Sequence, residues 1–463
     1  MSSLRAAIAI ICAAALAGCA SVSPVRIDVA GKAAGFRARS LDDAGLAAFV
    51  KQAKGDATVW PPAALSLRDL ELIALYDAPA ISTARAKLDA ARAAIRTARA
   101  IPNPTLTLDP AYVTGGGAAP PFFLASTLIQ LIETAGKRPL RVAKAEYFAE
   151  SARFQLAAAA WQAVARVDGA AIDLAAARAR IAALDEQVAV QGDVLDTAAK
   201  RLAVGLGSSV ELTIARTALT RATLERQTAR AAEIDAIHRL AEALGLPETA
   251  LPVDRLSVDL AGPRLADTFL LAARDGAPLR RADVLGGVAD YAASVVETRL
   301  QGAARVPNLE IGPSVEYDQG TKKWGVSVAA ALPIFNRNGG PIAEAGAQRR
   351  VAEGQLLEVQ ANAIGEVDRA ATAYRQAIEG LAVADRLVAE QSRQLGAQRR
   401  LLTAGQAGRG DVLAVQGDLA LARVGRADAL ATLARARLAV EVAAQAVGDG
   451  FDPAAFLTGL DEK

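Results

Sequence analysis

Residues able to carry out acid–base, nucleophilic or metal chemistry are scarce in this sequence. The chain of 463 residues has one histidine, His238, and two cysteines, Cys12 and Cys19. Transition-metal sites are built mainly from histidine and cysteine, so these three residues cannot supply one. The sequence also lacks a nucleophile–base pair, a phosphate-binding loop and a metal-ligand spacing. We therefore expect neither an enzyme nor a protein with a resident metal or other cofactor.

The neighbours of Cys19 indicate a covalent modification. Residues 6–16 form an apolar run that is too short to span a bilayer. The run ends in Leu16-Ala17-Gly18-Cys19, which resembles the lipobox of bacterial lipoproteins. This resemblance implies that residues 1–18 are a signal peptide and that Cys19 is acylated, with palmitate among the expected chains. Ala20 follows the cysteine, which favours the outer membrane over the inner one. An ordinary secretory signal is the alternative.

Composition excludes several classes of protein. Lysine and arginine together number 52, aspartate and glutamate 50, and aromatic residues make up 4% of the chain. Nucleic-acid binders need a basic surface or stacking rings, so we expect no nucleic-acid partner. Hydrophobic residues make up 52%, which argues against disorder. Much of this apolar content is alanine, so most of the chain is expected to be helical.

The chain contains an internal duplication of about 200 residues. Leu202-Ala203-Val204-Gly205 is matched by Leu402-Thr403-Ala404-Gly405, and Gly136-Lys137-Arg138 aligns with Asn336-Arg337-Asn338. Several matches in the same order at a near-constant offset indicate a repeated unit. The predicted divisions are the signal peptide 1–18, a lipidated extended segment 19–64, a first repeat 65–260 and a second repeat 261–463.

Each repeat contains a long stretch without proline. Prolines are absent between Pro139 and Pro247 and between Pro341 and Pro453, and helix-forming residues dominate up to a glycine cluster. The stretch before the first cluster, as a helix rising 1.5 Å per residue, would be roughly 100 Å long. Apolar residues recur in steps of three and four, which indicates a left-handed coiled coil or tube. A return helix is expected after each cluster, and a shorter helix before each strand pair.

Between the helices the apolar period changes to two. Residues 104–132 and 307–334 are each expected to form a pair of strands of about ten residues, long enough to cross a bilayer. Tyr112, Tyr317 and Trp324 lie near the loop ends, where aromatic residues mark a membrane interface. Four strands cannot close a barrel, so a membrane location requires several copies to share one. A soluble sheet with one buried face is the alternative.

Motifs beside the strands and turns resemble those of a known family. The most specific strings are Gln130-Leu131-Ile132-Glu133 leading into Gly136-Lys137-Arg138, and Leu332-Pro333-Ile334-Phe335-Asn336-Arg337-Asn338-Gly339-Gly340. With Arg281-Ala282-Asp283-Val284 and the two glycine turns, they resemble the TolC family of outer-membrane efflux ducts, most closely its cobalt–zinc–cadmium branch. The resemblance implies a mainly α fold with a membrane β-barrel portion. Three chains would share the barrel, four strands from each, and continue it as a periplasmic helical tunnel.

The resemblance also implies a function. The chain would be the outer-membrane channel of a tripartite efflux system, embedded in outer-membrane lipid. Its partners would be a periplasmic adaptor, or membrane fusion, protein and an inner-membrane pump of the resistance-nodulation-division type. It would passively conduct heavy-metal cations, or alternatively drugs and other organic compounds. A periplasmic adaptor or structural coiled-coil lipoprotein is the alternative from another class, but it would not explain the duplicated strands.

Site residues carry over from the family at the helical tips. The segments are Gly205–Glu211 and Gly405–Asp411, and the second includes Arg409. The resemblance implies that adaptors dock and the aperture closes there. Asp411 matches an acidic position that lines the aperture, and Glu211 is its counterpart in the first repeat. Asp411 can instead be the N-cap of the return helix, and the two roles are compatible.

Overall fold

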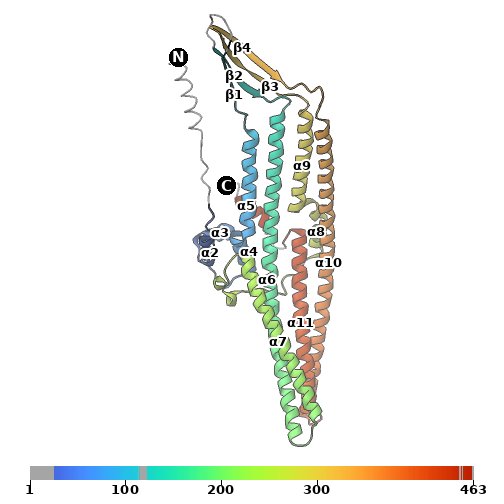
Figure 1. Cartoon of the computed structure of the whole chain (residues 1–463). Helices are drawn as coiled ribbons and strands as arrows, with labels where there is room; N and C mark the ends of the chain where they lie inside the picture. Colours follow the sequence, from blue (N-terminus) through green and yellow to red (C-terminus); the bar gives the residue numbers. More distant parts are fainter. Residues whose placement is uncertain (1–25, 113, 115–121, 448–449, 451, 461–463) are drawn as a thin grey trace.

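The molecule is elongated, with a small sheet at one end and helical hairpins at the other (Figure 1). The computed structural model describes residues 26–112, 114, 122–447, 450 and 452–460. The predicted signal peptide and Cys19 lie outside these residues. None of the helices in the described part of the chain has the length and apolar character needed to cross a membrane.

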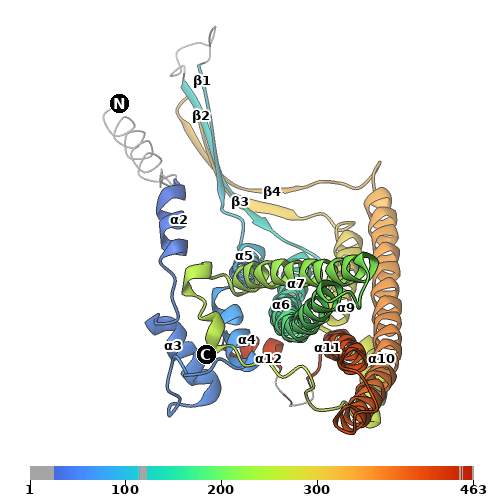
Figure 2. The ribbon, with the colours of Figure 1, turned by 90° about the horizontal axis from the view of Figure 1, so that it is seen from below.

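Two helical hairpins, each made of a long helix and a shorter return helix, form the body of the molecule. The helices are α6 (Lys137–Ala203, 67 residues), α7 (Ser209–Leu244), α10 (Gly339–Thr403, 65 residues) and α11 (Arg409–Ala444). At 1.5 Å per residue α6 is about 100 Å long, so the rods expected from the proline-free stretches are present. Neighbouring helices contact each other in the order α7, α6, α11, α10, and the view along the rods shows this order (Figure 2). The four helices thus form a wall rather than a compact ball.

Shorter helices lie beside this wall (Figure 1). A belt at its middle consists of α4 (Leu67–Asp77), α8 (Asp267–Arg280), α12 (Pro453–Leu460) and the short 3-10 turns Glu248–Ala250 and Val253–Arg255, whereas α5 (Pro79–Arg99) and α9 (Ala282–Ala303) run from this belt toward the sheet. The largest buried apolar cluster lies in this belt and includes Leu72, Leu156 and Leu240. The carboxylate of Asp69 accepts a hydrogen bond from the Ser66 amide, in the capping box that starts α4.

Part of the segment predicted to be extended, residues 19–64, is helical. α2 (Val29–Arg37) and α3 (Ala44–Lys54) each begin after an aspartate whose carboxylate accepts a backbone N–H. Both sequences are rich in alanine, and the aspartate caps favour helix at their starts. Leu46 and Val50 of α3 are fully buried in the belt. The description of this segment as extended is therefore wrong for α2 and α3.

Arg39 connects the N-terminal segment to the belt by hydrogen bonds. Its Nη1 donates to the carbonyl oxygens of Asp77 at 2.9 Å and Gly245 at 2.6 Å, at the ends of α4 and α7. In the second half of the chain, Arg281 donates to the carbonyl oxygen of Ala443 at 3.1 Å, near the end of α11. An arginine therefore satisfies the end of the return helix in both halves.

We expect Arg39→Met to release the N-terminal segment without disturbing the tips. Methionine keeps an unbranched apolar side chain but leaves two carbonyl oxygens without a charged donor, a loss of about 1.5–3 kcal/mol. Trypsin should then cleave the folded protein faster at Lys51 and Lys54. Arg37→Met, at an exposed position in α2, is the matched control. Equal cleavage of the two variants would show that the packing of α3 alone holds the segment.

The four strands form one antiparallel sheet in the order β1-β2-β3-β4. Their bounds are β1 (Thr105–Tyr112), β2 (Phe122–Ile132), β3 (Leu309–Asp318) and β4 (Thr321–Ala330). The pairing of β2 with β3 joins the hairpins of the two halves. β4 ends four residues before the predicted limit of residue 334, because the partner of Ala330, Leu309, is the first residue of β3.

Candidate functional site

The register of the sheet separates an apolar face from a polar one. Residues directly opposite each other in neighbouring strands lie on the same face. The pairs Leu106–Leu128, Ile311–Val328 and Val315–Trp324 lie on the apolar face. Among the residues of the four strands, this face carries a single charged side chain, that of Lys322. The opposite face carries Asp109, Glu310, Glu316, Asp318 and Lys323.

On β4, the apolar face is largely uncovered by the described residues. Trp324, Val326 and Val328 are 78%, 72% and 64% exposed. An exposed apolar patch of this kind marks contact with another chain or with lipid. β2 contributes Phe122, Leu124, Leu128 and Ile132 to the same face, although its sequence alternates poorly.

Aromatic residues gather at the loop end of the apolar face. Tyr112, Tyr317 and Trp324, predicted to lie at the membrane interface, are all on this face. Phe122 pairs with Tyr112, and its ring lies 6.3 Å from that of Tyr317. Phe122 was missed because only the register reveals its face. The interface role of these residues stays a prediction.

Glu133 ties the sheet to the long helix. Its carboxylate is 6% exposed and accepts hydrogen bonds from Arg141 Nη1 at 2.5 Å and Arg138 Nε at 2.9 Å. The bond from Arg141, and then that from Arg138, lower the pKa of Glu133 despite its burial. Arg141 Nε also donates to the carbonyl oxygen of Ala98 at 3.1 Å, at the end of α5. The Glu-x-x-Gly-Lys-Arg string is therefore a structural junction.

The junction also connects the two halves of the chain. Lys137 Nζ donates to Asn308 Oδ1 at 2.5 Å, and Thr134 Oγ1 donates to the carbonyl oxygen of Pro307 at 2.7 Å. Gly136, with φ 68°, precedes α6, and Asn338, with φ 58°, precedes α10. Glycine and asparagine tolerate this left-handed conformation well, so the two motif strings start the two long helices in the same way.

Each tip is a glycine-terminated helix followed by a capped return helix. Gly205 has φ 75° and Gly405 has φ 70°. Their amides each donate at 3.0 Å, to the carbonyl oxygens of Leu202 and Leu402. A positive φ is readily reached by glycine, which explains why the predicted turns begin at these positions.

Glu211 and Asp411 occupy equivalent positions, the third residue of each return helix. The amide of Glu211 donates to Ser208 Oγ at 3.1 Å, and its carboxylate lies 3.5 Å from Arg201 Nε. Asp411 Oδ2 accepts a hydrogen bond from the Gly408 amide at 2.8 Å. The predicted N-cap position for Asp411 is wrong by three residues, because Gly408 is the N-cap. The carboxylate still caps the helix from this third position.

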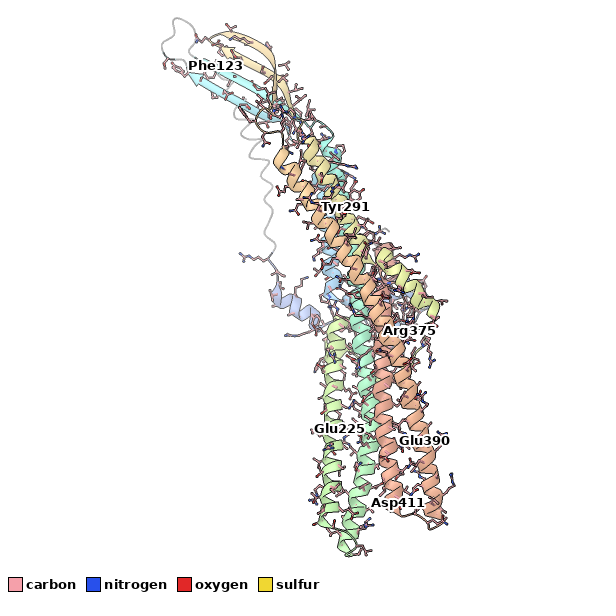
Figure 3. All side chains as sticks on the ribbon, turned by 90° about the vertical axis from the view of Figure 1, so that its right-hand side faces the viewer. Phe123, Glu225, Tyr291, Arg375, Glu390 and Asp411 are labelled. Carbon is pink, nitrogen blue, oxygen red and sulfur yellow. The ribbon has the colours of Figure 1, made fainter. Side chains whose placement is uncertain are left out.

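The two tips present different surfaces. The first tip exposes Val204, Leu206 and Val210 by 69%, 73% and 65%. The second exposes three arginines, Arg399, Arg400 and Arg409, together with Asp411. Among the residues that the structure describes, Arg409 has no ion-pair partner. Asp411 lies at the end of the molecule opposite the strand residue Phe123 (Figure 3).

A groove of about 490 Å³ lies between the tips. Its walls include Val194 of α6 and Ile214 of α7 on one side, and Gly410 and Leu413 of α11 on the other. Glu211 also lines the groove. Of the five predicted tip residues, Gly205, Glu211, Gly405, Arg409 and Asp411, only Glu211 is among the residues that line the groove. No group of three or more His, Cys, Asp and Glu side chains among the described residues could hold a metal ion.

Ion pairs between the long helices repeat with the duplication. Asp185 of α6 pairs with Arg226 of α7 at 3.2 Å, and Asp385 of α10 pairs with Arg426 of α11 at 2.6 Å. Each residue of the second pair lies 200 positions after its counterpart in the first. These pairs fix the register of each hairpin. Sequence reasoning missed them, although the equal offsets of the four residues would have revealed them.

Further ion pairs join the two hairpins. Arg180 of α6 pairs with Asp428 of α11 at 2.6 Å, and Asp173 pairs with Arg435 at 2.7 Å. The two pairs are one heptad apart on both helices, so they follow the same seam. All four side chains are partly exposed, and they define alignment more than stability.

Comparisons with known proteins agree with this architecture. A family model described as outer membrane efflux protein matches residues 73–246 and 276–444, more than half of the chain. Protein CyaE of Bordetella pertussis is 28% identical over 349 residues, 70% of this chain and 71% of CyaE. The outer membrane protein VceC of Vibrio cholerae has a TM-score of 0.68 at 19% identity, covering 82% of this chain and 96% of VceC. The open state of the MtrE outer membrane channel of Neisseria gonorrhoeae has a TM-score of 0.64 at 18% identity, covering 82% of this chain and 89% of MtrE. The chain therefore belongs to the outer membrane efflux protein family, whose TolC-like members are channels and not enzymes.

Proposed function

We propose that this protein is the outer-membrane duct of a tripartite efflux system, a homotrimer anchored in the lipid through Cys19. The observation that carries the proposal is the sheet with one apolar and one polar face at the end of helices about 100 Å long. β1 and β4 are the edges of this sheet. Unpaired strand edges are not tolerated in lipid, so β1 of one copy would pair with β4 of the next. The helices would continue the closed barrel into the periplasm.

Neighbouring residues on opposite faces of β4 provide a test. Val328→Lys would place a charge on the lipid-facing side, at a cost of about 2–4 kcal/mol near the bilayer midplane. Ser327→Lys would place the same charge in the lumen. We expect Val328→Lys to be lost from outer-membrane fractions, and Ser327→Lys to form heat-resistant trimers with altered ion selectivity in planar bilayers. Equal insertion of both variants would overturn the assignment of the faces.

We propose heavy-metal cations as the cargo. The polar face of the sheet carries four carboxylates and one lysine, and Lys323 pairs with Glu316 at 2.7 Å and Asp318 at 3.0 Å. Asp109 and Glu310 remain to face the lumen, and a negative lumen favours the passage of cations. The negative charge that supports a cationic cargo lies on the polar face of the sheet. At the second tip, exposed arginines outnumber acidic residues.

Deletion of the gene, followed by separate measurements of tolerance, tests the cargo. We expect tolerance to cobalt, zinc and cadmium to fall while tolerance to organic drugs is unchanged. Complementation with a double variant, Asp109→Asn with Glu310→Gln, should restore the metal tolerance only in part. Sensitivity to drugs alone would assign the duct to organic compounds and leave the proposed architecture intact.

We propose that the segments Gly205–Glu211 and Gly405–Asp411 form the periplasmic aperture and the docking site of the adaptor and its pump. The groove between the tips, with apolar side chains from the first tip, supports docking of a helical hairpin. Cross-linking from Val210 in the groove should capture the adaptor in cells. Cross-links from Asp109 in the sheet should not.

Two variants of Asp411 distinguish an aperture role from a capping role. Asp411→Asn keeps an oxygen that accepts from the Gly408 amide but removes the charge, whereas Asp411→Ala removes both. We expect both variants to reduce cation selectivity in single-channel recordings. Only Asp411→Ala should also destabilise the tip, by about 1 kcal/mol. Wild-type selectivity in Asp411→Asn would leave capping as the sole role.

A further inference from the structure

We infer that Lys322, on the apolar face of the sheet, binds the phosphate of a glycolipid. The inference rests on the proposed barrel, in which this face meets lipid. Lys322 is the second residue of β4 and the single charged side chain on the apolar face among the residues of the four strands. A charge on a lipid-facing surface is costly except near the membrane interface. The position of Lys322 and its surroundings therefore indicate a partner in the headgroup region.

Lys322 lies at the end of the sheet that points away from the helices. Thr321 pairs with Asp318, so Lys322 follows the tight turn between β3 and β4. At its other end β4 stops at Ala330 and the chain continues to α10 (Figure 1). The strand between Lys322 and Ala330 is about 27 Å long at 3.4 Å per residue. Even when tilted, it covers most of the apolar band of a membrane barrel, which is about 25 Å tall. Lys322 therefore lies at the outer rim of this band in the proposed barrel.

Aromatic side chains with polar tips accompany Lys322 on the same face. Tyr317 stands directly opposite it in β3, and Trp324 is two residues further along β4. Trp324 is 78% exposed, and Tyr112, at the same end of β1, is 71% exposed. A phenol or an indole joins an apolar ring to a hydrogen-bond donor, and such rings prefer the headgroup level of a bilayer. An ammonium beside these donors favours an anionic headgroup over an uncharged one.

The two consecutive lysines of β4 have different surroundings. Lys323 lies on the polar face, where its Nζ donates to Glu316 Oε1 at 2.7 Å and to Asp318 Oδ2 at 3.0 Å. Lys322 lies on the apolar face and is exposed. Within the described part of the chain it forms no ion pair. The carboxylates nearest in sequence thus serve the other lysine.

The rest of the proposed barrel does not supply a carboxylate to Lys322 either. Residues 113–121, which connect β1 to β2, contain no acidic residue. β1 would be the neighbour of β4 across the junction between copies, and its one acidic residue, Asp109, lies on the polar face. The counter-charge of Lys322 must therefore come from outside the protein, and the material around this face is lipid.

The location decides which lipid phosphate is within reach. Glycerophospholipids form the inner leaflet of bacterial outer membranes, whereas the outer leaflet consists mainly of a glycolipid with phosphates on glucosamine. The loop end of the sheet would face this outer leaflet, because the helices leave from the opposite end toward the periplasm. A phosphate oxygen accepts strong hydrogen bonds from an ammonium. The exposed rings of Tyr112 and Trp324 would lie against the sugar and the first carbons of the acyl chains.

Native mass spectrometry of the full-length protein, titrated with diphosphoryl lipid A, tests this inference. Lys322→Gln should raise the Kd for lipid A about fivefold, the effect of one lysine near an anionic lipid surface. Lys322→Arg keeps the charge and should bind as the wild type does. Lys323→Gln is the matched control, because it makes the same substitution at the next residue, on the opposite face. We expect the control to leave the Kd unchanged.

Several results would overturn the inference. Absence of lipid A binding, an unchanged Kd in Lys322→Gln, or an equal loss in Lys323→Gln would each contradict the site. Phosphatidylglycerol is the second probe, and binding as tight as that of lipid A would overturn the assignment to a glycolipid. The proposed duct is tested separately, by heat-resistant oligomers of the wild type in outer-membrane fractions. If these oligomers form while Lys322→Gln binds lipid A normally, the lipid site is wrong and the duct stands; if they do not form, both are wrong.

Discussion

Substitution of Gly312 by alanine should prevent the sheet from forming. Gly312 lies within β3, beside β2, and is the only buried residue of that strand. A Cβ atom there would lie 1.7 Å from the carbonyl oxygen of Leu128 and 3.0 Å from Cα of Ile129. Both are backbone atoms, so no change of rotamer relieves the clash. The two strands must separate, and theirs is the pairing that joins the hairpins of the two repeats.

The expected result is a near-complete loss of heat-resistant oligomers from the outer-membrane fraction, measured by electrophoresis without boiling. Gly354→Ala in α10 is the matched control, because a Cβ there meets no atom within 4 Å. Alanine in a helix is favoured over glycine by about 1 kcal/mol, so this control should assemble normally. A normal yield of Gly312→Ala oligomers would show that β2 and β3 do not pair as observed.

Features governed by local sequence could be predicted. The proline-free stretches give α6 and α10, and the glycines at 205 and 405 end them. Each depends on residues within a few positions of one another along the chain. The error at Asp411 has a local cause as well. Glycine is also tolerated at an N-cap, so the helix begins three residues earlier than its first acidic side chain suggests.

Features that depend on distant parts of the chain could not be predicted. The outward face of Phe122 follows from its pairing with Tyr112 and from the pairing of β2 with β3. The burial of Leu46 and Val50 depends on a core supplied by later helices. Periodicity in a single segment contains no information on which other segment covers it. For this reason the extended segment was predicted in place of α2 and α3.

The motif strings identify the family, but their structural role is seen only in the fold. Glu133 and Lys137 identify the family in sequence, but their spacing alone does not say what they do. In the structure Glu133 accepts a hydrogen bond from Arg141 and Lys137 donates one to Asn308 Oδ1, where the sheet meets the helices. A conduit needs its barrel held rigidly on its tunnel, and these residues supply that connection. At the tips, Asp411 similarly combines a local capping role with its proposed role at the aperture, whereas the carboxylate of Glu211 pairs with Arg201.

Replacement of Glu133 by glutamine should weaken this connection strongly. The carboxylate is buried and accepts bonds from both Arg138 and Arg141, whose side chains are about a third exposed. A neutral amide leaves the two cations without their counter-charge. Loss of one partner from a buried pair costs about 3–5 kcal/mol, and the exposure of the arginines places the expected loss near 3 kcal/mol. The midpoint of unfolding, followed by helical circular dichroism, should fall accordingly.

The pH dependence of the same variant provides the sharper test. The pKa of Glu133 is lowered in the folded protein, so its stabilisation is present above the unfolded pKa of about 4.3 and is lost as the pH falls through the folded value. Glu133→Gln should therefore differ from the wild type at neutral pH and approach it in acid. Glu146→Gln removes a surface pair with Arg99, both side chains being about half exposed or more, and should change stability by less than about 1 kcal/mol. If the two variants lose the same stability at neutral pH, the buried carboxylate does not hold the sheet to the helices. The hydrogen bonds of Lys137 to Asn308 and of Thr134 to Pro307 must then do so instead.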